Sequence, residues 1–148
     1  MPLSIVIPVF NSQETIRQLV EQLFDMPISD SLQVVLVDDG SVDGSPQICE
    51  DLAQRFHGSV VFVQLAKNFG EHNAVMAGLT YSRGDWVVVM DDDLQNPPEA
   101  VQSLHDAARN GDYDVVYSSI ADKKDRRWRI AGSWFNNLVC TVMLRKPY

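Results

Sequence analysis

Three consecutive aspartates, Asp91, Asp92 and Asp93, follow an apolar run at 86–90 that is typical of a strand covered on both faces of a parallel sheet. Because side chains alternate along an extended chain, we expect Asp91 and Asp93 on one side and Asp92 on the other. Open α/β sheets bind their ligands at the carboxyl ends of their strands. Carboxylate oxygens suit Mg²⁺ or Mn²⁺, which commonly share their coordination shell with substrate phosphates. The run therefore predicts a metal-bridged nucleotide diphosphate.

Three other interpretations of the acidic run are less consistent with its residues. A solvated loop is the usual role of clustered acidic residues and would bind nothing. An EF-hand calcium loop fits poorly, because Asn96 stands where that loop requires glycine and prolines follow. An aspartyl nucleophile would need a different strand context.

The elements that must position these residues alternate between strands and helices. Apolar and β-branched runs predict strands at 3–8, 33–37, 60–64, 86–90 and 115–118, and periodic patterns predict helices between them. Asn11 with Glu14 resembles a capping box for the first helix, and Ser45 with Pro46 marks the start of the second. Further helices are expected at about 71–81 and 98–110. This alternation predicts an α/β fold with a mostly parallel sheet and helices on both faces.

Polar or glycine-containing segments follow each of the first four strands. These segments are 8–11, 38–41, 67–70 and 91–95. A lone Asp-Asp-Gly is most often a turn, but four such segments at the carboxyl ends of parallel strands converge on one rim. The chain has no G-x-G-x-x-G after its first strand and no G-x-x-x-x-G-K-[ST], which disfavours a dinucleotide-binding or P-loop protein.

Composition narrows the class of protein. The 148 residues favour one domain, and a hydrophobic content of 45% is enough for a core. The net charge of −8 disfavours nucleic acid as a partner, yet residues 121–148 carry +5 and leave −13 on residues 1–120. Two cysteines without metal-type spacing favour a reduced, cytoplasmic setting. No signal peptide and no apolar stretch of about 18 residues are evident.

The motifs together resemble the family 2 glycosyltransferases of the GT-A fold, nearest to the polyprenyl-phosphate and dolichyl-phosphate sugar transferases. The resemblance runs from about residue 3 to the end and rests on the segments 5–11, 37–45, 67–72 and 91–99. It implies a Rossmann-like, three-layer α/β/α architecture. It also implies metal-dependent, inverting transfer of a sugar from a nucleotide-sugar, with UDP favoured over GDP-mannose, to a polyprenyl phosphate. The expected location is the cytoplasmic face of the membrane.

The resemblance assigns roles to particular residues. Asp91 and Asp93 would be catalytic and would hold Mg²⁺ or Mn²⁺ together with Gln95. The remaining residues would contact the nucleotide-sugar. Pro8 and Phe10 would contact the nucleobase, and Asp38 and Asp39 the base and ribose. Lys67 and Arg129 would contact phosphate, and Asn11 and Asp92 would also bind the substrate. Core packing for Phe10 and a solvated position for Lys67 stay open as alternatives.

The chain departs from the family pattern at several positions. Ser12 stands where members usually carry an acid, Asp92 where the middle of the Asp-x-Asp motif is commonly alanine, and Ile120 where many relatives have arginine. Members also continue well beyond the length seen here. Residues 1–120 are therefore expected to form the nucleotide-sugar-binding half, and residues 121–148 a segment leading into an absent C-terminal half, so that the fold is truncated at its C-terminus.

Residues 121–148 combine five clustered basic residues with an apolar stripe at helical spacing. The basic residues are Lys123, Lys124, Arg126, Arg127 and Arg129, and the stripe includes Trp128, Trp134 and Phe135. Such a helix could lie in a membrane interface or pack on the absent half. A homo-oligomer is also compatible with the sequence.

The sequence bears on two further functions. A catalytically incomplete module that only binds a nucleotide-sugar remains open. A nucleotidyltransferase is disfavoured, because the segment 8–11 lacks the glycine-rich, basic loop that such enzymes usually place after the first strand.

Overall fold

The structure is a computed structural model that describes residues 2–27, 31–111 and 113–117. Four parallel strands form one sheet in the order β3-β2-β1-β4. These are β1 (Leu3–Val9), β2 (Leu32–Asp38), β3 (Val60–Gln64) and β4 (Trp86–Val89). The helices between and after them are α1 (Ile16–Asp25), α2 (Ser45–Arg55), α3 (Glu71–Tyr81) and α4 (Glu99–Gly111).

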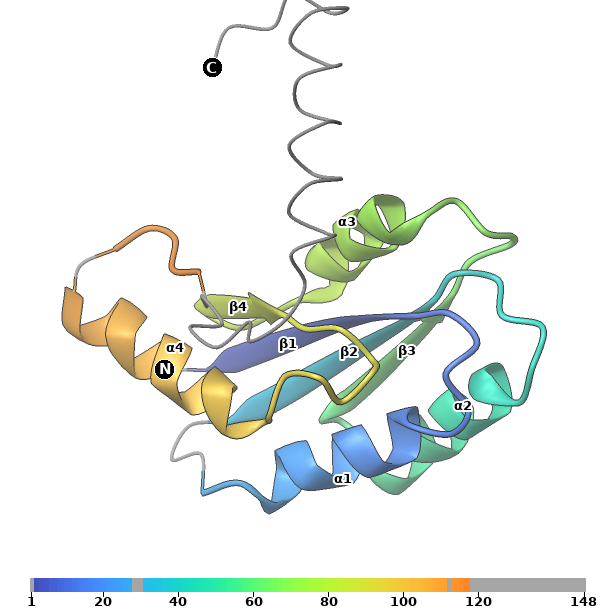
Figure 1. Cartoon of the computed structure of the whole chain (residues 1–148), viewed down its shortest axis with the longest axis horizontal. Coiled ribbons are helices and arrows are strands. Elements are labelled where there is room, and N and C mark those ends of the chain that lie inside the picture. Colours follow the sequence, from blue (N-terminus) through green and yellow to red (C-terminus); the bar gives the residue numbers. More distant parts are fainter. Residues whose placement is uncertain (1, 28–30, 112, 118–148) are drawn as a thin grey trace, which may run out of the picture. The chain divides into compact units, whose positions relative to one another are not determined.

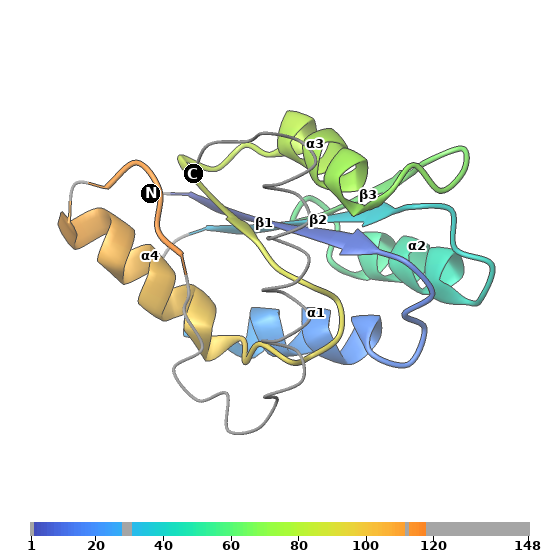
Figure 2. The same cartoon turned by 45° about the horizontal axis from the view of Figure 1, so that its top comes forward.

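Helices cover the two faces of the sheet. Figure 1 shows α1 and α2 on one face and α3 on the other, and the turned view of Figure 2 gives the same layering. The predicted α/β class and the parallel, three-layer arrangement are therefore confirmed for the described residues.

Period-two alternation along β1 and β2 sorts their apolar side chains between two cores. The α1 and α2 face buries Ile5, Ile7 and Leu36 with residues of the helices. The opposite face packs Val6 and Val37 beneath α3. A side chain on Gly78 of α3 would bring its Cβ within 2.4 Å of Val6 Cγ1, so the close approach of α3 to the sheet depends on this glycine.

The register of the strands brings the predicted rim together. Val9 pairs with Asp38, and Asp38 pairs with Gln64, so three strands end side by side. On the other side of β1, Val6 pairs with Val89, and the Met90 amide donates to the Val6 carbonyl at 3.0 Å. β4 therefore ends earlier than β1, and the acidic run that follows it lies beside the end of β1.

Three expectations about the elements were wrong. Val87 and Val89 are 40% and 50% exposed, so β4 is not covered on both faces. Residues 115–117 form no strand, and Val115 is 65% exposed without a neighbouring strand among the described residues. α1 begins at Ile16 after Thr15, so the capping box of Asn11 and Glu14 does not form.

The start of α2 also differs slightly from expectation. Gly44 is the N-cap and Ser45 is already helical, with Pro46 in the first turn. Within the described part of the chain, no helix combines the length and apolar content that crossing a bilayer requires.

Candidate functional site

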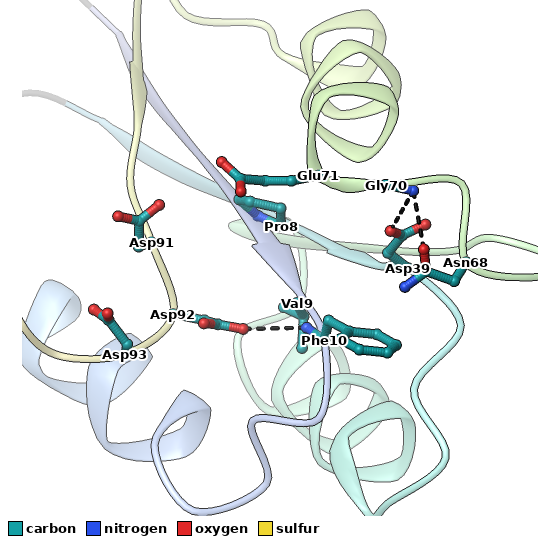
Figure 3. A pocket seen from close by; sticks show the side chains of 10 residues that line it. All are labelled: Pro8, Val9, Phe10, Asp39, Asn68, Gly70, Glu71, Asp91, Asp92 and Asp93. Atoms are coloured by element: carbon teal, nitrogen blue, oxygen red, sulfur yellow. Dashed lines mark hydrogen bonds between the residues drawn. The ribbon is translucent and has the colours of Figure 1, made fainter. Parts of the chain in front are cut away.

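A pocket of about 470 Å³ opens at the carboxyl ends of the strands (Figure 3). Its volume is in the range of small-molecule sites. Figure 3 shows Asp91 and Asp93 on one side of it and Phe10 with Asp39 on the other. The lining residues are Pro8, Val9, Phe10, Asp39, Asn68, Gly70, Glu71, Asp91, Asp92 and Asp93.

Pro8 and Phe10 come from the end of β1 and the loop that follows it. Phe10 is 48% exposed, so it is not a core residue and an aromatic face is available beside the pocket. Aromatic faces of this kind can stack on a base or pack against a sugar. Contact with a nucleobase stays a prediction for both residues.

Asp39 fastens the loop between β3 and α3 to the end of β2. Its two carboxylate oxygens accept hydrogen bonds from the Phe69 amide at 2.7 Å and the Gly70 amide at 2.8 Å. Gly70 has φ 93°, a conformation that favours glycine. Asp39 lines the pocket and retains unused lone pairs, so its predicted ligand contact remains compatible with this clamp.

Asp38 and Asn11 do not line the pocket. Asp38 is fully buried, and its carboxylate accepts from the Ser41 amide at 3.3 Å. Asn11 has φ 55°, and its side-chain oxygen accepts from the Val42 amide at 2.9 Å. Both side chains therefore shape the loops around the pocket, and their predicted substrate contacts remain untested.

The acidic side of the pocket concentrates negative charge. Burial raises the pKa of Asp91 above its ordinary value, and the neighbouring carboxylates Asp93, Glu71 and Asp92 raise it further. A divalent cation would relieve this repulsion, and the oxygen donors are those that Mg²⁺ and Mn²⁺ prefer. The donor set therefore fits the predicted metal.

The described residues do not by themselves form a closed metal cage. No group of three or more histidine, cysteine, aspartate or glutamate side chains in this part of the chain is arranged to hold an ion. Gln95 is exposed and outside the pocket lining, and its amide donates to Asp93 Oδ1 at 2.9 Å. An open site of this type leaves coordination positions for phosphate oxygens of a ligand.

Asp92 turns toward the other side of the pocket. Its Oδ2 accepts hydrogen bonds from the Phe10 amide at 3.1 Å and from the Ser12 hydroxyl, and its carbonyl accepts from Thr15 Oγ1 at 2.6 Å. Its carboxylate is thus held by the loop after β1.

Of the two predicted phosphate contacts, Lys67 lies within the described residues and Arg129 does not. The Lys67 ammonium lies 5.2 Å from the centre of the Phe69 ring and does not line the pocket. Arg129, the basic cluster and the apolar stripe of 121–148 lie outside the described residues.

Sequence reasoning did not assign roles to Glu71 and Asn68, which both line the pocket. They belong to the segment 67–72 that carried the family resemblance. The rule that ligands bind at strand ends could have found them, because α3 begins at Glu71 directly after the loop that follows β3.

Comparison with known proteins gives consistent matches. A family model described as Glycosyl transferase family 2 matches residues 4–146. An undecaprenyl-phosphate 4-deoxy-4-formamido-L-arabinose transferase of Pseudomonas aeruginosa (strain LESB58) is 40% identical over 144 residues. The match covers 96% of this chain and 41% of that relative, so the chain spans less than half the relative's length.

Solved structures share the fold. S. aureus TarS 1-349 in complex with UDP-GlcNAc has a TM-score of 0.64 at 24% identity, with 85% of this chain and 37% of that chain covered. The mannosyltransferase PcManGT from Pyrobaculum calidifontis, in complex with GDP-Man and Mn²⁺, has a TM-score of 0.57 at 22% identity, with 64% and 32% covered. At these identities the likeness establishes the fold alone.

Proposed function

Because this chain belongs to glycosyl transferase family 2, we propose that it is the nucleotide-sugar-binding part of an enzyme that transfers a sugar to a polyprenyl phosphate. Residues 1–120 would bind the nucleotide-sugar, and residues 121–148 would lead into the rest of the catalytic domain. The 40% identity to an undecaprenyl-phosphate sugar transferase supports this acceptor class.

The observation that carries the proposal is that one end of the pocket is apolar and the other is acidic. Phe10 and Pro8 offer an apolar surface on which a nucleobase can rest, and Asp91 and Asp93 offer hard oxygen donors across the same pocket. A nucleoside diphosphate has matching ends, a flat base and a charged diphosphate.

Asp91 and Asp93, with Gln95 joining from the same loop, would hold Mg²⁺ or Mn²⁺. When bound, the ion would offset the negative charge that grows on the departing diphosphate. The side chains of Asp91 and Asp93 then serve to orient the diphosphate, so that the sugar carbon faces the acceptor. Attack from the face opposite the diphosphate inverts the configuration at that carbon.

A phosphate acceptor explains why no general base is needed among the pocket residues. Its second pKa is about 6, so it is largely ionised at neutral pH and is already a nucleophile. A lipid-linked acceptor would bring the reaction to a membrane surface, and the family resemblance favours its cytoplasmic face.

We propose uridine rather than guanosine as the base, as the resemblance to the polyprenyl-phosphate sugar transferases implies. A second candidate function is a module that binds a nucleotide-sugar without transferring it.

Calorimetry of UDP and GDP with and without Mn²⁺ tests the binding proposal. Asp93→Asn should abolish the metal-dependent part of nucleotide binding and leave the fold intact. Asp85→Asn is the matched control, because Asp85 is an exposed aspartate at the opposite end of β4 and should bind as the wild type does. Unchanged affinity in Asp93→Asn would exclude the metal assignment.

Sugar transfer distinguishes the two candidate functions. We expect the 148-residue chain to bind nucleotide weakly and to transfer sugar slowly or not at all to a polyprenyl phosphate, since the acceptor side would be incomplete. Full turnover by this chain would show that these residues suffice, alone or as an oligomer.

A further inference from the structure

Two residues from opposite sides of the pocket meet in the structure. Ser12 lies in the loop after β1, and Asp92 lies in the loop after β4. They are 80 residues apart in the chain, yet the Ser12 hydroxyl donates a hydrogen bond to Asp92 Oδ2. The same oxygen accepts the Phe10 amide at 3.1 Å.

These contacts join the two loops that form opposite sides of the pocket. The Asp92 carbonyl accepts a third hydrogen bond from Thr15 Oγ1 at 2.6 Å, so three donors of the loop after β1 converge on one residue. Hydrogen bonds to an ionised carboxylate are stronger than those between neutral groups. Asp92 therefore fixes where Phe10 lies relative to Asp91 and Asp93 (Figure 3).

The loop after β1 is tied on its other side as well. The Asn11 amide donates to Ser41 Oγ at 2.9 Å, and the Ser12 amide donates to Ser45 Oγ at 2.8 Å. The loop is thus anchored to the loop after β2 and to the start of α2 independently of Asp92. Loss of the Asp92 carboxylate should release Phe10 from the acidic loop without unfolding the loop after β1, while Thr15 Oγ1 still holds the Asp92 carbonyl.

We propose that Asp92 is a positioning residue and that Asp92 with Ser12 forms a matched pair that sets the spacing between the base and diphosphate ends of the pocket. An acid at position 12 would place a second carboxylate against Asp92, and the two charges would repel. An acid at position 12 would therefore require an uncharged residue at position 92. The role in ligand spacing rests on the proposed function, whereas the pairing itself does not.

A cycle of four chains tests the pair: the wild type, Ser12→Glu, Asp92→Ala and the double variant. In the ligand-free chain, Asp92→Ala should speed hydrogen exchange of the Phe10 amide about tenfold. The Leu65 amide, which donates to the Asp38 carbonyl at 2.9 Å where β2 and β3 end, should be unaffected. Asp92→Asn retains an acceptor oxygen and should fall between Asp92→Ala and the wild type.

Calorimetry with UDP and Mn²⁺ on the same chains tests the spacing between the base and diphosphate ends of the pocket. Asp92→Ala should weaken UDP binding about tenfold, while the Mn²⁺ concentration needed for half-maximal binding stays unchanged because Asp91 and Asp93 are intact. Ser12→Glu should weaken UDP binding more, and the double variant should recover affinity and melting temperature relative to Ser12→Glu. Ser103→Glu on α4 controls for added charge, because Ser103 is exposed and outside the pocket.

Recovery in the double variant is the result that supports a matched pair. Additive losses in the double variant, or unchanged Phe10 exchange in Asp92→Ala, would overturn the proposal. If the wild type bound no UDP, the proposed function would fail, and exchange together with thermal unfolding would still decide whether the pair exists.

Discussion

The carboxylate of Asp39 holds the backbone of Phe69. One of its oxygens accepts a hydrogen bond from the Phe69 amide at 2.7 Å, and the other accepts one from the Gly70 amide at 2.8 Å. Asp39 is 3% exposed, so these hydrogen bonds are shielded from water. The ends of β2 and β3 are thereby joined at the pocket, and the position of Glu71 at the start of α3 follows from this joint.

Asp39→Asn should therefore destabilise the fold as well as the pocket. An amide side chain presents one oxygen and one NH₂ group, so one backbone amide would face another donor, at a cost of about 1–3 kcal/mol in the free energy of unfolding. Urea denaturation measures this cost. Asp51→Asn is the control, because the Asp51–Arg17 ion pair is exposed at 3.5 Å and should contribute under about 1 kcal/mol. Equal stabilities of the two variants would contradict the clamp.

Gly40 permits the same two loops to touch. It has φ +75°, and a Cβ there would lie 2.5 Å from the Asn68 nitrogen and 2.7 Å from the Lys67 carbonyl carbon. Gly40→Ala should therefore lower the free energy of unfolding by roughly 1–2 kcal/mol, because alanine is strained in the left-handed conformation. The added Cβ should also push the two loops apart.

Gly58→Ala separates these two effects. Gly58 has φ +88°, but nothing lies within 4 Å of a Cβ at that position. Gly58→Ala should lower the melting temperature slightly and leave UDP affinity unchanged, whereas Gly40→Ala should lower both. Identical behaviour of the two variants would show that backbone conformation alone accounts for the loss.

Local patterns predicted the elements well where local forces decide them. β3 and α3 match the sequence expectation residue for residue, and the family and the α/β fold were confirmed. The start of α1 was missed because Asn11 bonds across to Val42, a contact between distant loops that a capping rule cannot include. A strand at 115–118 was expected from apolar residues alone, but a strand also needs a partner, and none of the described strands pairs with residues 115–117.

Part of the candidate site could also be predicted from the sequence. Convergence of strand ends brought Pro8, Phe10, Asp39 and the three aspartates into one pocket, as expected. The burial of Asp38 could not be read from the Asp-Asp-Gly motif, because both aspartates have the same local context. The hydrogen bond between Ser12 and Asp92 could not be predicted either, because it depends on the register of β1 against β4.

The basic cluster near residue 126 is expected to bind anionic membranes. Each basic residue near such a surface contributes on the order of 1 kcal/mol, and the attraction weakens with salt. Co-sedimentation with anionic vesicles should therefore decrease as salt rises, and also on joint replacement of Arg126, Arg127 and Arg129 by glutamate. Equal binding to neutral and anionic vesicles, or binding to neither, would exclude an electrostatic contribution.

Replacement of Asp91 should change the stability of the fold in opposite directions with and without a bound ligand. Burial and the charges of Asp93 and Glu71 raise the pKa of Asp91, so its ionised form is disfavoured in the folded chain. Asp91→Asn should therefore raise the melting temperature in EDTA at neutral pH. The gain should shrink at high salt, which screens the repulsion. With Mn²⁺ and UDP present the order should reverse, because the wild type gains binding free energy that the variant lacks. A variant that is less stable than the wild type in EDTA would show that Asp91 supports the fold instead of serving the pocket.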